Sequence, residues 1–321
     1  MSRKAFDQKI DQIQAIRGTD RAQAAVQLKK ALRDRNNFLV SKAAIVAAEL
    51  ELRDLVGDLT AAFDRFMENP IKTDPQCWAK IEIARALRRL DHRETATFLR
   101  GVRHKQLEPT YGGSQDSAGQ LRGICALGLL GCPIADADLF PILTDLLVDP
   151  ELPARVDAVR AVAQAGRSES VWLLRLKALC GDRDWEVIGE CLVALLDLQP
   201  KESVEFVERF LYQDEDGSME AASALAQSRE LEAFEALKRF WKGRIISDTR
   251  RSVLSFLAGS PVPESAEFLF ETMQNESGPL AETALESLSR SRFRSEMHDR
   301  VESALKAKGD GKLMELWWRL G

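Results

Sequence analysis

Aromatic and charged side chains recur along one predicted helix at spacings that place them on a single face. Trp78, Glu82, Arg85 and Arg89 follow one another by four, three and four residues, which is the spacing of neighbours on a helix surface. An aromatic ring beside arginines is typical of protein-binding surfaces, and the same combination stacks on nucleic-acid bases. The stripe therefore predicts recognition, although Trp78 also fits a place in the core.

A row of polar residues recurs four positions before a small residue that anchors each predicted inner helix. Its members are Glu82, Arg122, Asp157, Glu190, Glu220, Arg251 and Thr283. Arg85 and Arg160, three positions further on, share this helix face. We expect the face to be concave, with Arg85 and Arg122 exposed. Two interpretations stay open: a ladder of ion pairs between repeats, or a groove that binds a mixed-charge segment.

The longest interruption of the pattern spans residues 103–116 and includes Gly112-Gly113, which permits a tight reversal. Insertions in repeat proteins emerge at one edge, often beside the binding surface. We therefore expect this loop to close one edge of the groove, with His104 and Tyr111 as contacts. His104 and Glu108 have the types of an acid–base pair, but a histidine beside a carboxylate is commonly only hydrogen-bonded.

Catalytic and metal signatures are absent from the sequence. There is no nucleophile elbow, dinucleotide fingerprint or complete phosphate-binding loop. The three histidines and five cysteines show no zinc spacing and no Cys-x-x-Cys. We therefore assign no catalytic residue, cofactor or metal. The cysteines are expected to be buried free thiols, and they are Cys77, Cys125, Cys132, Cys180 and Cys191.

The elements that position these residues form an internal repeat. Seven segments carry a small residue followed by a small-plus-bulky pair, and the pairs begin at Ala86, Ala126, Ala161, Ala194, Ala224, Ser255 and Ser287. Successive pairs lie 40, 35, 33, 30, 31 and 32 residues apart. A period of this length, built from two amphipathic helices, indicates an α-solenoid.

Prolines and glycines divide the repeats into inner and outer helices. The inner helices are expected near 77–90, 117–130, 152–165, 185–198, 218–228, 248–258 and 279–289. The outer helices are expected near 94–103, 137–148, 170–180, 202–212, 231–242 and 264–274. No strand-like alternation of useful length appears, so the sequence predicts an all-α fold.

Bulk composition fits a globular chain of 321 residues, with 45% hydrophobic and 30% charged residues. No apolar run is long enough to span a bilayer, and the first residues lack a signal core, so we expect a cytoplasmic protein. The net charge of −5 divides unevenly, with +6 in residues 1–110 and −11 in residues 111–321. A partner surface that meets the N-terminal part is therefore expected to be acidic.

At the repeat anchors the chain resembles the HEAT-repeat family, and more narrowly the bacterial HEAT-like repeats of the phycocyanobilin lyase type. The resemblance is carried by Asp149-Pro150-Glu151, followed by Arg155 and the alanine-rich helix to Val162. It spans roughly residues 37–305. It implies an armadillo-type, right-handed α-α superhelix, and it implies scaffold or adaptor function, because most members of the family bind proteins.

Enzymes with similar repeats provide a direct test. Deoxyhypusine hydroxylase holds two irons with His-Glu pairs, whereas His92, His104 and His298 are followed here by Arg, Lys and Asp. HEAT-like DNA glycosylases use a strongly basic face, which this acidic chain lacks. A bilin lyase activity stays an alternative, but nothing in the sequence marks a chromophore pocket.

We therefore expect capping helices in residues 1–36, a repeat array in 37–305 and a C-terminal capping helix in 306–321. The predicted function is a non-catalytic scaffold that binds a protein partner along its concave face. The expected contacts are Trp78, Glu82, Arg85, Arg89, His104, Tyr111, Arg122, Asp157 and Arg160. The alternatives are an enzyme or enzyme subunit that uses the groove, or a nucleic-acid-binding protein.

Overall fold

The computed structural model describes residues 3–244 and 246–320, with side chains from Phe6 onward, and these residues are almost entirely helical. Contacts divide the chain into two compact units, Met1–Ala165 and Gly166–Gly321, which are described separately below. The all-α fold class predicted from the repeat is confirmed.

The first unit contains ten α-helices, three 3₁₀ turns and two strands among its described residues. In chain order they are α1 (Arg3–Ala15), η1 (Ile16–Gly18), α2 (Arg21–Leu32), α3 (Asn37–Glu49), η2 (Arg53–Leu55), α4 (Val56–Met67), α5 (Pro70–Thr73), η3 (Pro75–Cys77), α6 (Trp78–Arg89), α7 (Thr95–Val102), β1 (Leu107–Thr110), β2 (Gly113–Asp116), α8 (Gly119–Leu129), α9 (Asp136–Leu146) and α10 (Leu152–Ala165).

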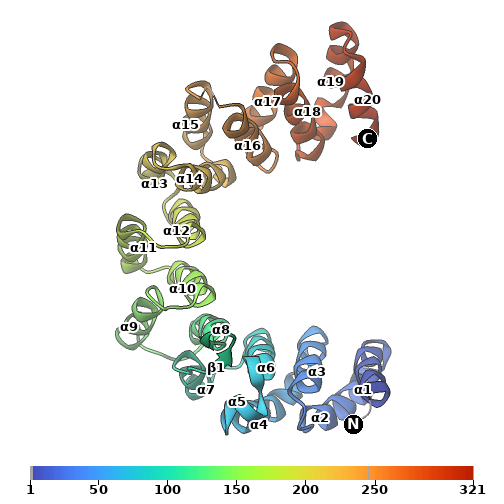
Figure 1. Ribbon diagram of the computed structural model, residues 1–321, viewed down its shortest axis with the longest axis vertical. Helices are drawn as coiled ribbons and strands as arrows, with labels where there is room; N and C mark the ends of the chain where they lie inside the picture. The colour runs from blue at the N-terminus through green and yellow to red at the C-terminus, as the bar shows by residue number, and fades with distance from the viewer. Residues whose placement is uncertain (1–2, 245, 321) are drawn as a thin grey trace. The chain divides into compact units, whose positions relative to one another are not determined.

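Two layers of helices make up this unit, as Figure 1 shows. In the inner layer α3 packs on α6, α6 on α8, and α8 on α10. In the outer layer α2, α4, α7 and α9 each pack on the inner helix that follows them in the chain. Within this unit, α6 and α8 each bury one side against an outer helix and two flanks against inner helices.

The second unit repeats the same arrangement. Its described elements are α11 (Ser168–Cys180), α12 (Trp185–Leu198), α13 (Pro200–Glu208), η4 (Arg209–Tyr212), α14 (Glu215–Gln227), α15 (Leu231–Lys242), α16 (Ser247–Leu257), α17 (Pro263–Asn275), α18 (Pro279–Arg290), α19 (Arg294–Lys308) and α20 (Gly311–Leu320). The even-numbered helices α12 to α18 form the inner layer, and α11 to α19 with odd numbers form the outer layer (Figure 1).

Small side chains explain the close packing of the inner layer. Ala43, Ala44 and Ala47 of α3 are fully buried and face the neighbouring helices. A helix with alanine at these positions lets the adjacent backbone approach closely, and interior packing leaves few voids. Most small residues that define the sequence repeat are buried in the same way, among them Ala86, Ala126 and Ala161, whereas Ser255 is exposed.

The turns before several inner helices share one hydrogen-bonding device. An aspartate carboxylate accepts from the backbone N–H two residues later, at 2.9 Å for Asp34, 3.0 Å for Asp116, 2.8 Å for Asp149 and 2.9 Å for Asp182. Such Asx turns fix the direction in which the chain enters a helix. The Asp149 turn is the one on which the HEAT resemblance was based, and Arg155 donates to its backbone carbonyl oxygen at 2.8 Å.

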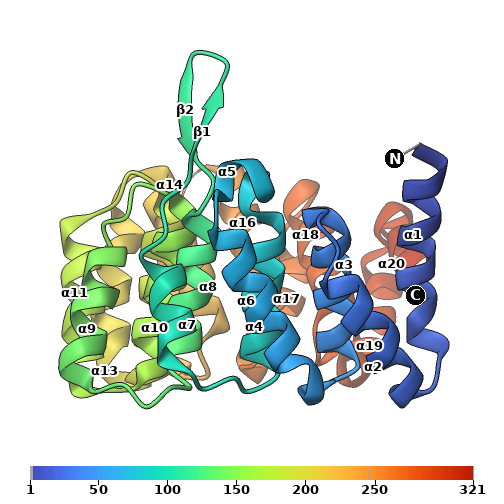
Figure 2. The same cartoon turned by 90° about the horizontal axis from the view of Figure 1, so that it is seen from below.

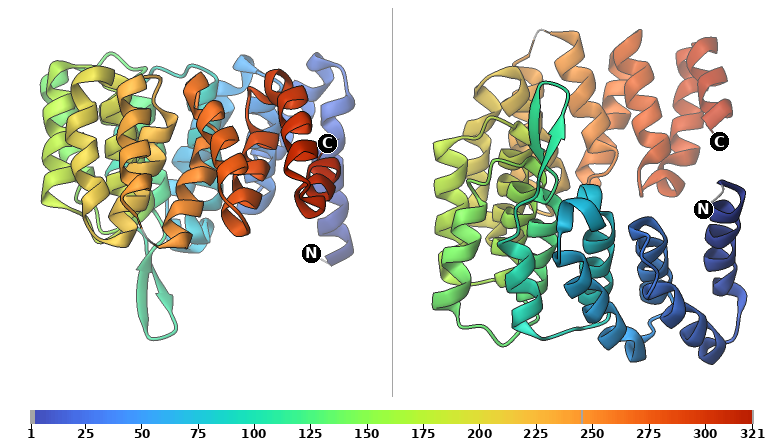
Figure 3. Two further views of the ribbon diagram at one scale, coloured as in Figure 1. Left: turned by 90° about the horizontal axis from the view of Figure 1, so that it is seen from above. Right: turned by 60° about the horizontal axis from the view of Figure 1, so that its bottom comes forward.

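The single long insertion forms a β-hairpin rather than an irregular loop. β1 and β2 pair antiparallel, with Leu107 opposite Asp116 and Thr110 opposite Gly113. Tyr111 and Gly112 form the turn, and the φ of +91° at Gly112 explains the glycine there. Figures 2 and 3 show the hairpin standing out beyond the ends of the helices. Strands of four residues are too short to show alternation, so the sequence did not reveal them.

The expectation of buried thiols is confirmed for three cysteines and wrong for one. Cys77, Cys125 and Cys191 are free and buried, and burial raises the pKa of Cys191 to about 12. Cys132 is half-buried. Cys180 is exposed because it ends α11 on the side away from the buried stripe of that helix.

The C-terminal tryptophan pair has two different environments. Helix α20 packs on α18 and α19, and Trp317 is 3% exposed between them, whereas Trp318 is 67% exposed. Leu313 and Leu316 are buried on the same face as Trp317. The helix therefore covers the apolar side of α18 with one tryptophan and presents the other to solvent.

Replacing Trp317 by alanine is expected to lower the free energy of unfolding by about 3–5 kcal/mol, because a buried indole is lost and a cavity remains. Trp318→Ala, the matched control, is expected to change it by about 0.5 kcal/mol or less. Urea unfolding followed by circular dichroism measures both. Equal losses for the two variants would contradict this packing of α20.

Candidate functional site

A groove crosses the inner layer of the first unit. It has a volume of about 790 Å³ and is lined by residues of α3, α6, α8 and α10. Each helix contributes residues spaced by three or four positions, which form one stripe on its surface. These are Ile45, Ala48 and Glu49 from α3, Glu82, Arg85, Ala86, Arg88 and Arg89 from α6, Gln120, Ile124 and Leu127 from α8, and Asp157, Arg160 and Gln164 from α10.

The floor of the groove is apolar and its sides are charged. Ile124 and Leu127 of α8 are only 5% and 7% exposed, and Ala86 of α6 lies fully buried beside them. Arginines and carboxylates from the flanking helices surround this floor. An apolar base with a polar rim is the usual composition of a protein-binding surface.

All three carboxylates that line the groove are paired with arginines. Glu82 forms an ion pair with Arg85 within α6, and Asp157 pairs with Arg160 within α10 at 3.4 Å. Glu49 pairs with Arg17 at 2.7 Å. The first two pairs lie within one helix, so they do not link neighbouring repeats.

Two arginines remain uncompensated. Arg88 and Arg89, in the last turn of α6, are exposed, and neither forms an ion pair or a side-chain hydrogen bond within residues 3–244 and 246–320. Both line the groove. The groove therefore carries an excess of positive charge at the C-terminal end of α6.

Asp157 lies at the closest approach of two inner helices. A Cβ on Gly123 of α8 would come within 2.6 Å of the Cβ and a carboxylate oxygen of Asp157, so only glycine fits there. Burial raises the pKa of Asp157, while Arg160, Arg85 and Arg88 act in the opposite direction. Because Gly123 has no side chain, α10 lies close to α8, and the half-buried carboxylate of Asp157 lines the groove.

Arg122 does not belong to this surface, so the expectation that it is exposed is wrong. It is 2% exposed and donates to both oxygens of Asp149, at 2.8 and 2.7 Å. It also donates to Asp116 at 2.8 Å and to the carbonyl oxygen of His104 at 2.9 Å. Arg122 lies in the first turn of α8, where the turns at Asp116 and Asp149 meet, so its side chain points inward instead of following the row.

Trp78 also lies outside the groove. It begins α6, its ring is 46% exposed, and it packs edge-on against Phe38 with ring centroids 5.4 Å apart. Trp78 therefore lies neither in the core nor in the groove, the two places expected from the sequence. Of the nine predicted contacts, the structure brings together Glu82, Arg85, Arg89, Asp157 and Arg160.

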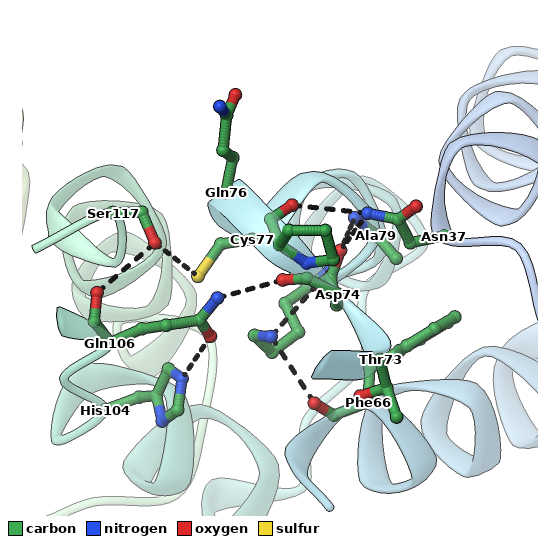
Figure 4. Close-up of polar contacts among 12 residues, drawn as sticks. Asn37, Phe66, Thr73, Asp74, Gln76, Cys77, Ala79, His104, Gln106 and Ser117 are labelled. Atoms are coloured by element: carbon green, nitrogen blue, oxygen red, sulfur yellow. Dashed lines mark hydrogen bonds and ion pairs between the residues drawn. The ribbon is translucent and has the colours of Figure 1, made fainter. Parts of the chain in front are cut away.

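A second polar cluster fastens the base of the hairpin to the helices, and Figure 4 shows its contacts around Gln106 and Asp74. Glu108 accepts from the backbone N–H of Gln76 at 2.6 Å, from Gln106 at 2.7 Å and from Ser117 at 2.6 Å. Gln106 also donates to the carbonyl oxygen of Asp74 at 2.9 Å. These contacts fix the hairpin at its base, and all three donors bind the same oxygen, Oε1, of Glu108.

The cluster has the electrostatics of a structural site. Burial alone would raise the pKa of Glu108, but the hydrogen bonds from Ser117, Gln106 and the N–H of Gln76 hold it below its ordinary value. Burial lowers the pKa of His104, whose ring contacts Gln106 at 3.1 Å. Because the ring of His104 contacts the amide of Gln106 and the Glu108 carboxylate accepts from other donors, the two side chains do not form the acid–base pair that their residue types suggest.

Tyr111 is fully exposed at the tip of the hairpin, away from the groove. The expectation that the insertion closes one edge of the groove is therefore wrong, because the hairpin projects beyond the helices (Figure 2).

Several groove residues were missed from the sequence. Ile45, Ala48 and Glu49 of α3, and Gln120, Ile124 and Leu127 of α8, follow the same helical spacing as Glu82, Arg85 and Arg89. They fall outside the polar rows predicted from the sequence, because in α8 the row positions Arg122 and Cys125 are buried and other residues of the helix line the groove. The α3 residues precede Ala86, the first anchor of the sequence repeat.

Within the described residues, no cluster of histidine, cysteine, aspartate or glutamate has the arrangement of a metal site. None of the described helices is both long and apolar enough to cross a membrane.

No protein-family model and no curated protein matches this chain. Among solved structures, the complex of CpcE and CpcF of phycocyanin lyase from Nostoc is 18% identical with a TM-score of 0.36, covering 72% of this chain and 89% of that chain. Human deoxyhypusine hydroxylase is 17% identical with a TM-score of 0.30, covering 76% and 87%. Scores this low carry no functional argument. The class of protein, an all-α solenoid of HEAT-like helix pairs, rests on the chain's own repeats.

Arg122→Ala is expected to lower the free energy of unfolding by about 3–5 kcal/mol, because it leaves the buried Asp116 and Asp149 without their cation. Arg85→Ala removes an exposed arginine of the groove and is expected to change it by less than about 1 kcal/mol. Chemical denaturation compares the two variants. An unchanged free energy of unfolding for Arg122→Ala would contradict this clamp, in which Arg122 joins Asp116 and Asp149.

Asp116 is expected to make stability depend on acid pH. Burial alone would raise its pKa, but hydrogen bonds from the N–H groups of Gln106 and Ala118 and from Arg122 hold the pKa below its ordinary value. Its contribution is therefore present above about pH 4 and is lost as the pH falls through the lower folded pKa. Urea midpoints of Asp116→Asn and the parent chain should differ at pH 7 and converge towards pH 3. A constant difference would contradict this.

Proposed function

We propose that this chain is a non-catalytic scaffold or adaptor that binds an acidic segment of a protein partner in the groove formed by α3, α6, α8 and α10. The observation that carries the proposal is the combination of an apolar floor with two uncompensated arginines, Arg88 and Arg89, in one groove. An amphipathic segment buries its apolar side on such a floor and places carboxylates beside the arginines.

The size and composition of the groove favour a polypeptide over a small metabolite. A volume of about 790 Å³ is spread across four helices and is open along its length, whereas small-molecule sites enclose most of the ligand. The polar groups come from four repeats instead of converging on one point. No arrangement within the described residues favours the enzymatic alternative.

The charge of the groove also argues for a protein rather than a duplex. Glu49, Glu82 and Asp157 lie among the arginines, and a nucleic-acid backbone would be repelled by them. A mixed-charge surface with a small positive excess suits a protein segment that carries a few carboxylates.

Affinity capture tests the proposal, with the full-length chain and its Arg88→Glu/Arg89→Glu variant as parallel baits. A partner that binds the parent chain through the groove should be lost from the variant. With the purified partner, calorimetry should show a loss in affinity of about tenfold or more, since each reversed charge faces a carboxylate. Binding should weaken as salt rises.

Arg103→Glu is the matched control, because Arg103 is an exposed arginine at the end of the outer helix α7 and does not line the groove. It should leave affinity unchanged, and all variants should keep the parent unfolding midpoint. If the double reversal leaves binding intact while Trp318→Ala abolishes it, the binding surface lies at α20 and the proposal is wrong.

A further inference from the structure

The β-hairpin presents one open strand edge. Residues Pro109 to Gln115 are all exposed, and Tyr111 at the tip is fully so. Leu107 at the base of β1 is 60% exposed. A paired strand with unoccupied outer N–H and C=O groups is a template for a further strand.

Backbone geometry distinguishes the two edges. The N–H of Ser117 donates to the carbonyl oxygen of Gln106 at 3.0 Å, so these opposed residues form a hydrogen-bonded pair. Hydrogen-bonded and non-hydrogen-bonded pairs alternate in an antiparallel ladder. In the register of this hairpin, Pro109 and Ser114 then form a non-hydrogen-bonded pair, whose own backbone groups point outward.

The outer edge of β1 is blocked and that of β2 is open. Pro109 has no N–H, so β1 cannot continue a ladder at that position. Ser114 offers both an N–H and a C=O to the outside. The base of β1 is also occupied, because Glu108 binds the N–H of Gln76 in η3.

The base of β2 lies beside a free carboxylate. Arg122 joins Asp116, the last residue of β2, to Asp149 in the turn before α10. Glu151 follows in the same turn, and its side chain packs on Gly119, three residues after β2. The Glu151 carboxylate forms no ion pair among the residues that the structure describes.

We propose that the β2 edge binds an extended, basic segment of a partner protein as a third strand of the hairpin. Backbone hydrogen bonds to Ser114 hold the segment. A lysine or arginine of the segment pairs with Glu151. Because the base of the hairpin is already fixed, the hairpin loses little conformational entropy on binding. This surface is separate from the groove and does not depend on its proposed function.

A displayed library of random peptides of about eight residues, long enough to form a strand, serves as the probe. It is selected on the full-length chain, and peptides that also bind a chain with residues 107–116 replaced by a short glycine linker are removed. Recovered peptides should be rich in lysine or arginine. Fluorescence polarisation should show that Ser114→Pro weakens them about tenfold or more, because one donor is lost and the edge is blocked.

Leu107→Pro is the matched control, since it places a proline at an outward position of β1 and should leave affinity unchanged. Glu151→Gln should weaken binding about threefold and reduce its salt dependence. Cross-strand nuclear Overhauser effects between Glu108 and Gln115 verify that each variant keeps the hairpin. The Arg88→Glu/Arg89→Glu chain should bind these peptides normally, which separates this test from that of the groove.

Any of three results would overturn the proposal. The first is that the selection recovers no peptide whose binding depends on the hairpin. The others are that Ser114→Pro, with its hairpin intact, binds the peptides as tightly as the parent chain, or that Leu107→Pro weakens binding and Ser114→Pro does not.

Discussion

The buried guanidinium of Arg122 is the interaction on which the middle of the first unit depends. It joins the end of β2 through Asp116, the turn before α10 through Asp149, and the segment after α7 through the carbonyl oxygen of His104. A cation that is 2% exposed is tolerated only when its partners are complete. The hairpin, α8 and α10 are therefore fixed together. Neither the hairpin nor these two helices, which line the groove, can shift without breaking a buried charge pair.

The groove follows from how closely the inner helices approach one another. Ala43, Ala47 and Gly123 have small side chains or none at the contacts, so the helix backbones come close. The larger residues then lie towards the open face. Asp157 illustrates the consequence, because it is pressed against Gly123 and its pKa rises through burial. The same spacing that makes the repeat detectable thus also produces a surface with an apolar floor and charged sides.

The sequence predicted the helices well because most repeats need a small residue at a fixed position, where the side chain is buried between helices. It placed Glu82, Arg85 and Asp157 on one face for the same reason. Periodicity gives the face of a side chain but not its neighbours across the fold, so the inward bend of Arg122 towards Asp149 was not predictable from spacing. The hairpin was missed because its strands have four residues each, although Gly112 correctly marked the reversal.

Two kinds of recognition would coexist within the first unit if both proposals hold. In these two proposals the groove selects side chains through Arg88 and Arg89, whereas the edge at Ser114 binds the backbone of the partner and selects charge through Glu151 alone. Because the clamp at Arg122 fixes the hairpin to the helices that line the groove, the distance between the two surfaces is set before binding. A partner with an acidic segment and a basic segment at matching separation would gain affinity from effective concentration without any new contact. Two individually weak surfaces would then discriminate by the spacing of the partner's segments as well as by their charge.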